Sequence, residues 1–226
     1  MKSSFRTFEP EAMRDIVTSN GAPQDWILTT EQRNADRFAA LAGRWDQDVW
    51  VFAYGSLMWD PGFHFAEVRR GFAPRAERRF TLCDRFGGRG TRDAPGVMAA
   101  LENGSGCNGL VFRISRDIID VETELVWRRE RMGHAYFPAF IEVQTDQGPV
   151  EALAFMANHA ATLIDTDLTY EQQVQYCATG KGWLGTSLDY VANLAEHFET
   201  MRIVDKGVTG LLRDARAYRD RHSITM

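Results

Sequence analysis

The stretch that decides the fold is Val49 to Phe63, VWVFAYGSLMWDPGF. Its first residues are mostly β-branched or aromatic, which is typical of a buried strand. The strand pattern then breaks at Tyr54-Gly55-Ser56-Leu57. Glycine permits close approach to the backbone, and backbone N–H groups just past a strand end can bind a small carboxylate. The alternative is an ordinary strand-end turn whose Leu57 enters the core.

Outward from this stretch, the chain alternates short strand-like segments with turn residues. The expected strands cover about 66–72, 77–83, 97–102, 109–114, 137–145 and 150–157. One helix is expected over about 115–133, and further helices fill the tail from Thr169 to about Arg221. This order predicts an α+β fold with a compact mixed sheet or barrel, one inserted helix and flanking terminal helices.

The length and composition of the chain predict its domain organisation. The 226 residues are 44% apolar and 25% charged, which is typical of a soluble globular protein. We expect residues 1–46 to form a helical extension packed on a main domain of residues 47–226, because no Pro/Ser-rich linker separates them. Within the extension, Thr29-Thr30-Glu31 predicts a helix start, and Gly43 predicts its end.

Composition also argues against several classes of protein. The net charge of −5 argues against a nucleic-acid binder that relies on a basic field. No apolar run approaches the ~20 residues that span a bilayer, so no membrane association is expected. The N-terminus lacks the apolar core of a secretory signal. The expected partner is a small molecule, and the sequence leaves the oligomeric state open.

The cysteines and histidines predict neither a disulfide framework nor a metal centre. Three cysteines stand far apart in the chain, which fits reduced thiols in a cytoplasmic protein: Cys83, Cys107 and Cys177. The best metal candidate is His159 near Asp165, but that pattern is more typical of a polar loop. We therefore expect no metal and no cofactor.

The segment ATGKGWLGTS contains the letters G-x-G-x-x-G within residues 180–185. A dinucleotide site requires this motif after a strand, whereas here it follows a helical pattern. Lys181 also lacks the Ser or Thr that must follow the lysine of a P-loop. We interpret the segment as a helix–loop–helix turn with Thr186 or Ser187 as the next N-cap.

Glu130 is the strongest candidate for chemistry. With Ile119 and Val126 it shares one helix face, and it lies in the last turn, where the helix dipole disfavours an anion. Partial burial and the dipole should raise its pKa, which suits a general acid or base. The neighbouring arginines are expected to point elsewhere, because sequence neighbours diverge on a helix: Arg128, Arg129 and Arg131. A structural Glu–Arg pair is the alternative.

The order and spacing of these motifs resemble the ChaC-type γ-glutamylcyclotransferases, in their bacterial form. Besides residues 54–57 and the Arg129-Glu130 pair, the similarity includes 78–80, 95–97, 108–112 and 184–190, and it covers roughly 49–198. Eukaryotic-like members have Gly-Gly-Tyr soon after the glutamate. Here the matching tyrosine is Tyr136, at the longer spacing of bacterial members. Residues 1–46 have no counterpart in the shorter members.

The resemblance implies a carbon–nitrogen lyase that degrades glutathione. The α-amine of the substrate attacks its own γ-carbonyl, forms 5-oxoproline and releases cysteinylglycine. Glu130 would be the general acid/base, and the backbone of Gly55, Ser56 and Leu57 would bind the α-carboxylate. Tyr54 would shape the pocket.

Three further residues are assigned to substrate binding through the same resemblance: Tyr136, Thr186 and Tyr190. Tyr136 could donate to a carboxylate or to the carbonyl oxygen, and the other two could reach the peptide end of glutathione. Other readings stay open at this point. They are the same reaction on another γ-glutamyl compound, a non-catalytic small-molecule binding module, and a nucleotide-binding protein that uses ATGKGWLG.

Overall fold

A computed structural model describes residues 4–223. Residues 1–3 of the predicted extension and residues 224–226 of the predicted main domain lie outside the described residues. The contacts divide the chain into two compact units, which are described separately. The first unit holds the residues up to Arg14, Gln24–Arg78 and Leu101–Asn158. The second holds Asp15–Pro23, Arg79–Ala100 and the residues from His159 onward.

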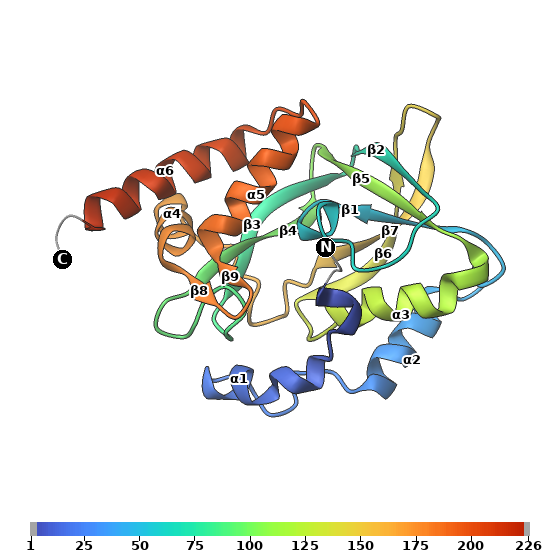
Figure 1. Cartoon of the computed structure of the whole chain (residues 1–226), viewed down its shortest axis with the longest axis horizontal. Helices are drawn as coiled ribbons and strands as arrows, with labels where there is room; N and C mark the ends of the chain where they lie inside the picture. Colours follow the sequence, from blue (N-terminus) through green and yellow to red (C-terminus); the bar gives the residue numbers. More distant parts are fainter. Residues whose placement is uncertain (1–3, 224–226) are drawn as a thin grey trace. The chain divides into compact units, whose positions relative to one another are not determined.

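Seven strands form one mixed sheet (Figure 1). They are β1 (Val49–Ala53), β2 (Glu67–Ala73), β3 (Ala76–Asp84), β4 (Gly96–Asn103), β5 (Cys107–Ile114), β6 (Tyr136–Val143) and β7 (Val150–Ala157). Their order is β2-β5-β1-β7-β4-β3, and β6 pairs with β7. The mixed α+β class is therefore confirmed, and each strand lies where the sequence pattern predicted it.

The sheet is open among the described residues, although a barrel was one of the expected forms. β2 pairs with β5 along its whole length. On its other side, the one backbone bridge of β2 among the described residues joins Phe72 to Gln144, just after β6. β2 and β6 can approach closely next to this bridge because residue 71 is a glycine. A Cβ at Gly71 would come within 2.6 Å of the Val143 side chain. β2 and β6 therefore approach each other in the first unit, but within residues 4–223 no continuous ladder of hydrogen bonds between them closes the sheet into a barrel.

β7 organises the first unit. β6 pairs antiparallel with β7 from Val150 to Ala157 and so occupies one of its edges. On the other edge, β1 pairs in parallel at Ala152 and Leu153, while Leu101 of β4 pairs with Met156. β1 and β4 therefore share one edge of β7 and must separate. The chain leaves β1 at this separation, which places the predicted carboxylate-binding loop there.

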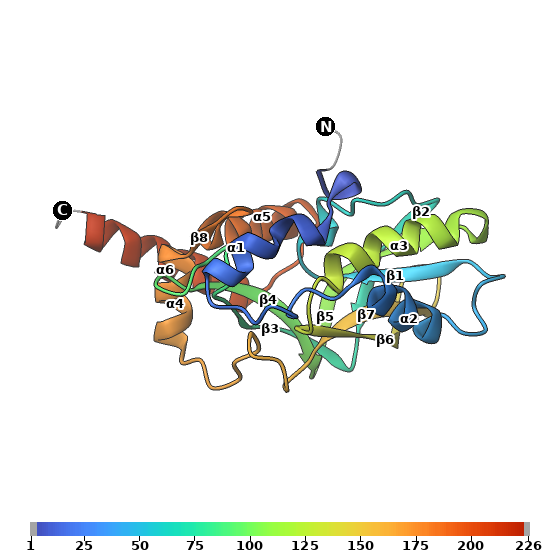
Figure 2. The ribbon, with the colours of Figure 1, turned by 90° about the horizontal axis from the view of Figure 1, so that it is seen from below.

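Two helices of the first unit, α2 (Thr30–Ala40) and α3 (Ile119–Glu130), lie side by side (Figure 2). α2 begins at the predicted cap, Thr29, and ends earlier than Gly43 suggested. α3 is shorter than predicted, because its first turn, Arg116–Ile118, is a 3-10 helix. Trp127 of α3 is 1% exposed and packs edge-on against Phe155 of β7 at 5.2 Å, which fixes the helix on the sheet. The chain before α2 contains two short 3-10 helices, Ser4–Thr7 and Pro10–Met13.

The second unit is mainly helical and contains α4 (Tyr170–Thr179), α5 (Ser187–Thr200) and α6 (Lys206–Ser223), which pack on one another (Figure 1). The second unit also contains the short helix α1 (Arg14–Ser19) except for Arg14, which belongs to the first unit. The G-x-G-x-x-G letters lie between α4 and α5, as predicted, and they include a small hairpin of β8 (Lys181–Gly182) and β9 (Gly185–Thr186). Within residues 4–223, no helix has the length and apolar character needed to cross a membrane.

Candidate functional site

The loop after β1 offers three adjacent backbone donors. A 3-10 helix, Ser56–Met58, begins directly after Gly55. The first N–H groups of a helix have no acceptor within the helix. Among the described residues, no acceptor faces the N–H groups of Gly55, Ser56 or Leu57. The loop is held by later bonds, from Met58 N–H to the Gly55 carbonyl at 3.0 Å and from Asp60 N–H to the Ser56 carbonyl at 3.0 Å. The arrangement can accept a carboxylate without a charged side chain.

Tyr54 anchors this loop to the sheet. Its side chain is buried, and its hydroxyl donates to the Phe155 carbonyl of β7 at 3.0 Å. The Tyr54 carbonyl accepts from Arg78 Nε at 2.7 Å, and the same guanidinium donates to the Asn108 carbonyl at 2.5 Å. Tyr54 therefore shapes the loop through the backbone of two neighbouring segments.

Glu130 is the last residue of α3, and its side chain is 12% exposed. Ile119 and Val126 on the same face are 4% and 1% exposed, so the predicted inward stripe is confirmed. Burial raises the pKa of the Glu130 carboxyl above its ordinary value, while the positive charge of Arg129 opposes that rise. A carboxyl group in this state can exchange a proton nearer neutral pH.

The expectation that the flanking arginines point away from Glu130 is wrong for Arg129. Its Nε lies 3.2 Å from Glu130 Oε1, and its side chain is 7% exposed. The direction of a Cα–Cβ bond does not decide where a long guanidinium side chain ends. Arg131 has other partners, with its Nε 2.9 Å from Asp36 Oδ2.

Arg129 also binds the loop after β1. Its Nη2 donates to Ser56 Oγ at 2.7 Å, and its Nη1 donates to the Asp60 carbonyl. One guanidinium therefore contacts both Glu130 and Ser56, two residues that the sequence assigned to one site. Sequence reasoning did not identify this role. The Arg-Glu pair was its signal, but only the fold shows that the arginine reaches Ser56.

The predicted site residues are divided between the two units. Residues 54–57, Glu130 and Tyr136 belong to the first unit, whereas Thr186 and Tyr190 belong to the second. Tyr136 is the first residue of β6, pairs with Ala157 and accepts from Arg131 through its carbonyl. Its side chain is partly buried.

In the second unit, the two predicted binding residues have internal hydrogen bonds. Thr186 Oγ1 accepts from Asp189 N–H at 2.9 Å, which makes Thr186 the N-cap of α5. The Tyr190 hydroxyl accepts from Ala99 N–H at 3.3 Å, and the Arg89 guanidinium lies 5.1 Å from the Tyr190 ring. Both residues thus support the second unit, and their contact with a substrate stays a prediction.

A cavity of about 500 Å³ lies in the second unit and was not predicted from the sequence. Residues of the α1 end, of the segment after β3 and of α4 line it: Asn20, Gly21, Arg85, Phe86, Arg92, Pro95 and Tyr176. Two guanidinium groups and a phenol make its lining polar. None of the predicted substrate-binding residues is part of that lining.

The three cysteines are buried free thiols. Burial raises the pKa of the Cys177 thiol to about 12, and it raises the pKa of the Cys83 thiol as well. A thiol that stays protonated is a poor nucleophile. Across residues 4–223, no group of three or more His, Cys, Asp and Glu side chains is arranged to hold a metal ion.

Comparisons with known proteins agree with this architecture. The family model described as ChaC-like protein matches residues 49–218. The chain is 33% identical to the glutathione-specific gamma-glutamylcyclotransferase of Escherichia coli, over 88% of this chain and 87% of that protein. It is 29% identical to the human glutathione-specific gamma-glutamylcyclotransferase 1, over 68% of this chain and 71% of that protein.

The fold also matches a crystal structure of the yeast gamma-glutamylcyclotransferase specific to glutathione. The TM-score is 0.72 at 19% identity, over 77% of this chain and 98% of the yeast chain. Because the identity is only 19%, this comparison supports the fold and not the activity. The family match extends from β1 into α6 and therefore includes both units. By sequence and by fold, the chain belongs to the ChaC family.

Proposed function

We propose that this protein degrades glutathione by intramolecular cyclisation. The nitrogen of the substrate α-amine attacks the γ-carbonyl carbon and forms the five-membered ring of 5-oxoproline. The bond from that carbon to the cysteine nitrogen breaks, and cysteinylglycine leaves. No water is consumed, and the net proton transfer is from the attacking amine to the departing one. The family and its glutathione-specific relatives support this reaction.

The observation that carries the proposal is the placement of Glu130. In our mechanism the ionised Glu130 carboxylate accepts the proton of the α-amine and later returns it to the leaving nitrogen. A single carboxyl group can serve both steps if its pKa lies nearer neutrality than usual, and burial moves the pKa of Glu130 in that direction. Arg129 Nε lies 3.2 Å from one oxygen of this carboxylate, Oε1, and in our mechanism this contact helps to orient the group for proton transfer.

The loop after β1 would bind the other end of the γ-glutamyl group. The N–H groups of Gly55, Ser56 and Leu57 would donate to the substrate α-carboxylate. Holding this carboxylate fixes the α-amine attached to the same carbon, so that the amine meets the γ-carbonyl. We assign Tyr136 as a donor to the substrate, and Thr186 and Tyr190 to its peptide end.

The first experiment incubates the purified protein with reduced glutathione and measures 5-oxoproline and cysteinylglycine by mass spectrometry. Glu130→Gln keeps the shape of the side chain and removes the base, so turnover should fall by about 100- to 10,000-fold. Circular dichroism would show that the variant is folded. Activity should also survive a strong chelator.

Three results would contradict parts of this proposal. Full activity in Glu130→Gln would remove the residue from the mechanism. Products from other γ-glutamyl compounds but none from glutathione would redirect the substrate assignment. Binding without any product would favour a non-catalytic module.

A cytoplasmic location and the division into residues 1–46 and 47–226 also remain proposals. Cell fractionation tests the location, and expression of residues 47–226 alone tests the division.

A further inference from the structure

The segment from Phe5 to Glu11, here called the N-terminal arm, contacts the helix that carries Glu130. The arm lies before residue 49, where the family match begins. It consists of parts of two short 3-10 helices, so its own backbone bonds fix it weakly. Its position in the first unit must therefore come from its side chains.

Arg6 is the main anchor of the arm. Its two Nη atoms donate to the two carboxylate oxygens of Glu122 at 2.8 and 3.0 Å. The Glu122 side chain is only 4% exposed, and it also accepts from His64 N–H at 2.7 Å. Burial alone would raise the pKa of Glu122, but the bonds from Arg6 and His64 lower it below its usual value. Loss of Arg6 would leave a buried carboxylate poorly compensated, so this pair holds the arm on α3.

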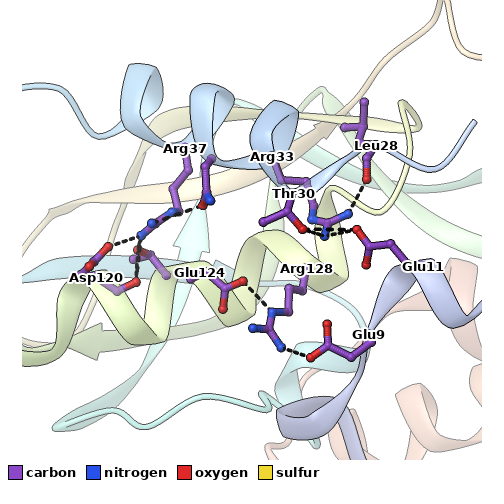
Figure 3. Close-up of polar contacts among 11 residues, drawn as sticks. Glu9, Glu11, Leu28, Thr30, Arg33, Arg37, Asp120, Glu124 and Arg128 are labelled. Carbon is purple, nitrogen blue, oxygen red and sulfur yellow. Dashed lines mark hydrogen bonds and ion pairs between the residues drawn. The ribbon is translucent and has the colours of Figure 1, made fainter. Parts of the chain in front are cut away.

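Two acidic residues of the arm add further ion pairs to the neighbouring helices (Figure 3). Glu9 lies 2.6 Å from Arg128 of α3, and Arg128 also binds Glu124. Glu11 lies 2.7 Å from Arg33 of α2, whose side chain is 4% exposed. Exposed ion pairs contribute little singly, but together these contacts fix the arm at three points.

Phe5 connects this anchored arm to the candidate site. The Arg129 guanidinium carbon lies 3.9 Å from the centre of the Phe5 ring, well within the range of a cation–π contact. Phe8 packs edge-on against Phe5 at 5.8 Å and supports the ring. Arg129 is thus held by Phe5 as well as by the oxygens of Ser56, Asp60 and Glu130.

We propose that the N-terminal arm is a positioning element, in which Phe5 and Arg129 hold Glu130 and the loop after β1 in their working arrangement. Phe5 acts through Arg129 and does not itself meet the substrate. This inference rests on the proposed function of Glu130. It assigns the arm a part in the reaction as well as in folding.

The test compares Phe5→Leu with Phe5→Trp. Leucine keeps an apolar side chain but lacks the ring face that attracts the guanidinium, whereas tryptophan keeps that face. Phe5→Leu should lower kcat for glutathione about 3- to 10-fold, with KM changed less than about twofold. Phe5→Trp should retain kcat within about twofold of the native protein.

Phe38→Leu is the matched control. Phe38 of α2 is likewise a phenylalanine next to an arginine, although it is exposed where Phe5 is half-buried, and the Arg37 guanidinium lies 4.9 Å from its ring. Arg37 bonds to Asp120 and Thr123, with no bond to Glu130. Phe38→Leu should therefore leave kcat unchanged. An equal loss in Phe38→Leu, or native kcat in Phe5→Leu, would overturn the inference.

A second measurement separates this inference from the proposed function. Hydrogen–deuterium exchange of a peptide that covers residues 55–60 reports the N–H groups of Met58 and Asp60, which are bonded within the loop. Exchange should be faster in Phe5→Leu than in the native protein and unchanged in Phe38→Leu. If the native protein releases no 5-oxoproline, the proposed function fails. In that case the exchange rates alone decide whether the arm positions the loop, and equal rates would exclude it.

Discussion

Two glycine-containing loops of this molecule look alike in sequence and differ in their backbone hydrogen bonds. Both lead into a helical turn, the first at Gly55 and the second between Gly180 and Gly185. In the first loop, three successive N–H groups have no acceptor in the described part of the chain. In the second, the Trp183 and Leu184 N–H groups donate to the Gly87 and Gly88 carbonyls at 2.9 and 2.8 Å.

This difference explains why the second loop, which has more glycines, is the weaker candidate for a ligand-binding site. In the second loop, glycine is required because backbone packs against backbone. A Cβ on Gly182 would collide with the carbonyl oxygens of Gly87 and Gly88. Backbone donors used for internal packing cannot bind a ligand, whereas donors left without acceptors can. The comparison predicts that changes in the second loop affect stability before they affect turnover.

The largest stability effect is expected for Gly182→Ala. The added methyl group meets backbone oxygens that cannot move as a side chain does, so unfolding free energy should fall by about 3 kcal/mol. Gly210→Ala is the control, because its nearest neighbour, the Tyr170 hydroxyl, is at an ordinary 3.6 Å. Urea unfolding measures both variants. A stable Gly182→Ala variant that had lost turnover would reverse the roles of the two loops.

Ser187→Ala tests how firmly the second loop is tied to β4. The buried Ser187 hydroxyl donates to the Val97 carbonyl at 2.5 Å and accepts from the Val97 N–H at 3.0 Å. Alanine leaves both backbone groups unsatisfied, so stability should fall by about 2 kcal/mol. Ser187→Thr keeps the hydroxyl and serves as a comparison for added bulk. An unchanged urea midpoint in Ser187→Ala would show that these bonds contribute nothing.

Thr186→Ala distinguishes a helix cap from a substrate contact. Loss of the bond to Asp189 N–H should cost about 1 kcal/mol of stability, and Thr186→Ser should restore it. If Thr186 acts only as the cap, KM for glutathione stays native in both variants. A KM that rises in Thr186→Ala and recovers in Thr186→Ser would support the predicted contact with the peptide end.

The last stability prediction concerns pH and belongs to the first region. Because the folded-state pKa of Glu130 is raised, its stabilising contribution is complete below the ordinary Glu pKa. That contribution is lost as pH rises through the raised value. Glu130→Gln should therefore gain stability relative to the native protein as the pH is raised from the ordinary Glu pKa through the raised one, as measured by urea unfolding. A relative loss over this interval would mean that the pair with Arg129 outweighs burial.

The same group sets the pH dependence of catalysis. As a general base, Glu130 acts in its ionised form, so kcat/KM should rise with pH through the raised pKa of Glu130. The acid limb should therefore lie above the ordinary range of a glutamate. A profile that is flat down to the ordinary Glu pKa would argue against Glu130 as the base.

Local patterns in the sequence determined much of this protein. The strands were predicted because alternating or continuous apolar runs and turn residues are local signals, as in the buried run of β7. The capping box of Thr29 and Gln32 and the inward face of α3 follow from spacing along one helix. The order of the motifs also identified the family.

Other features were decided only by the tertiary structure, because they depend on long side chains and on distant backbone. The reach of Arg129 to Ser56 and its contact with Phe5 join segments that are far apart in the sequence. The open sheet depends on how β2 and β6 meet at a single bridge. Whether a backbone N–H group has an acceptor is likewise a property of the folded chain. Spacing in the sequence fixes which residues share an element, whereas packing between elements fixes which groups meet.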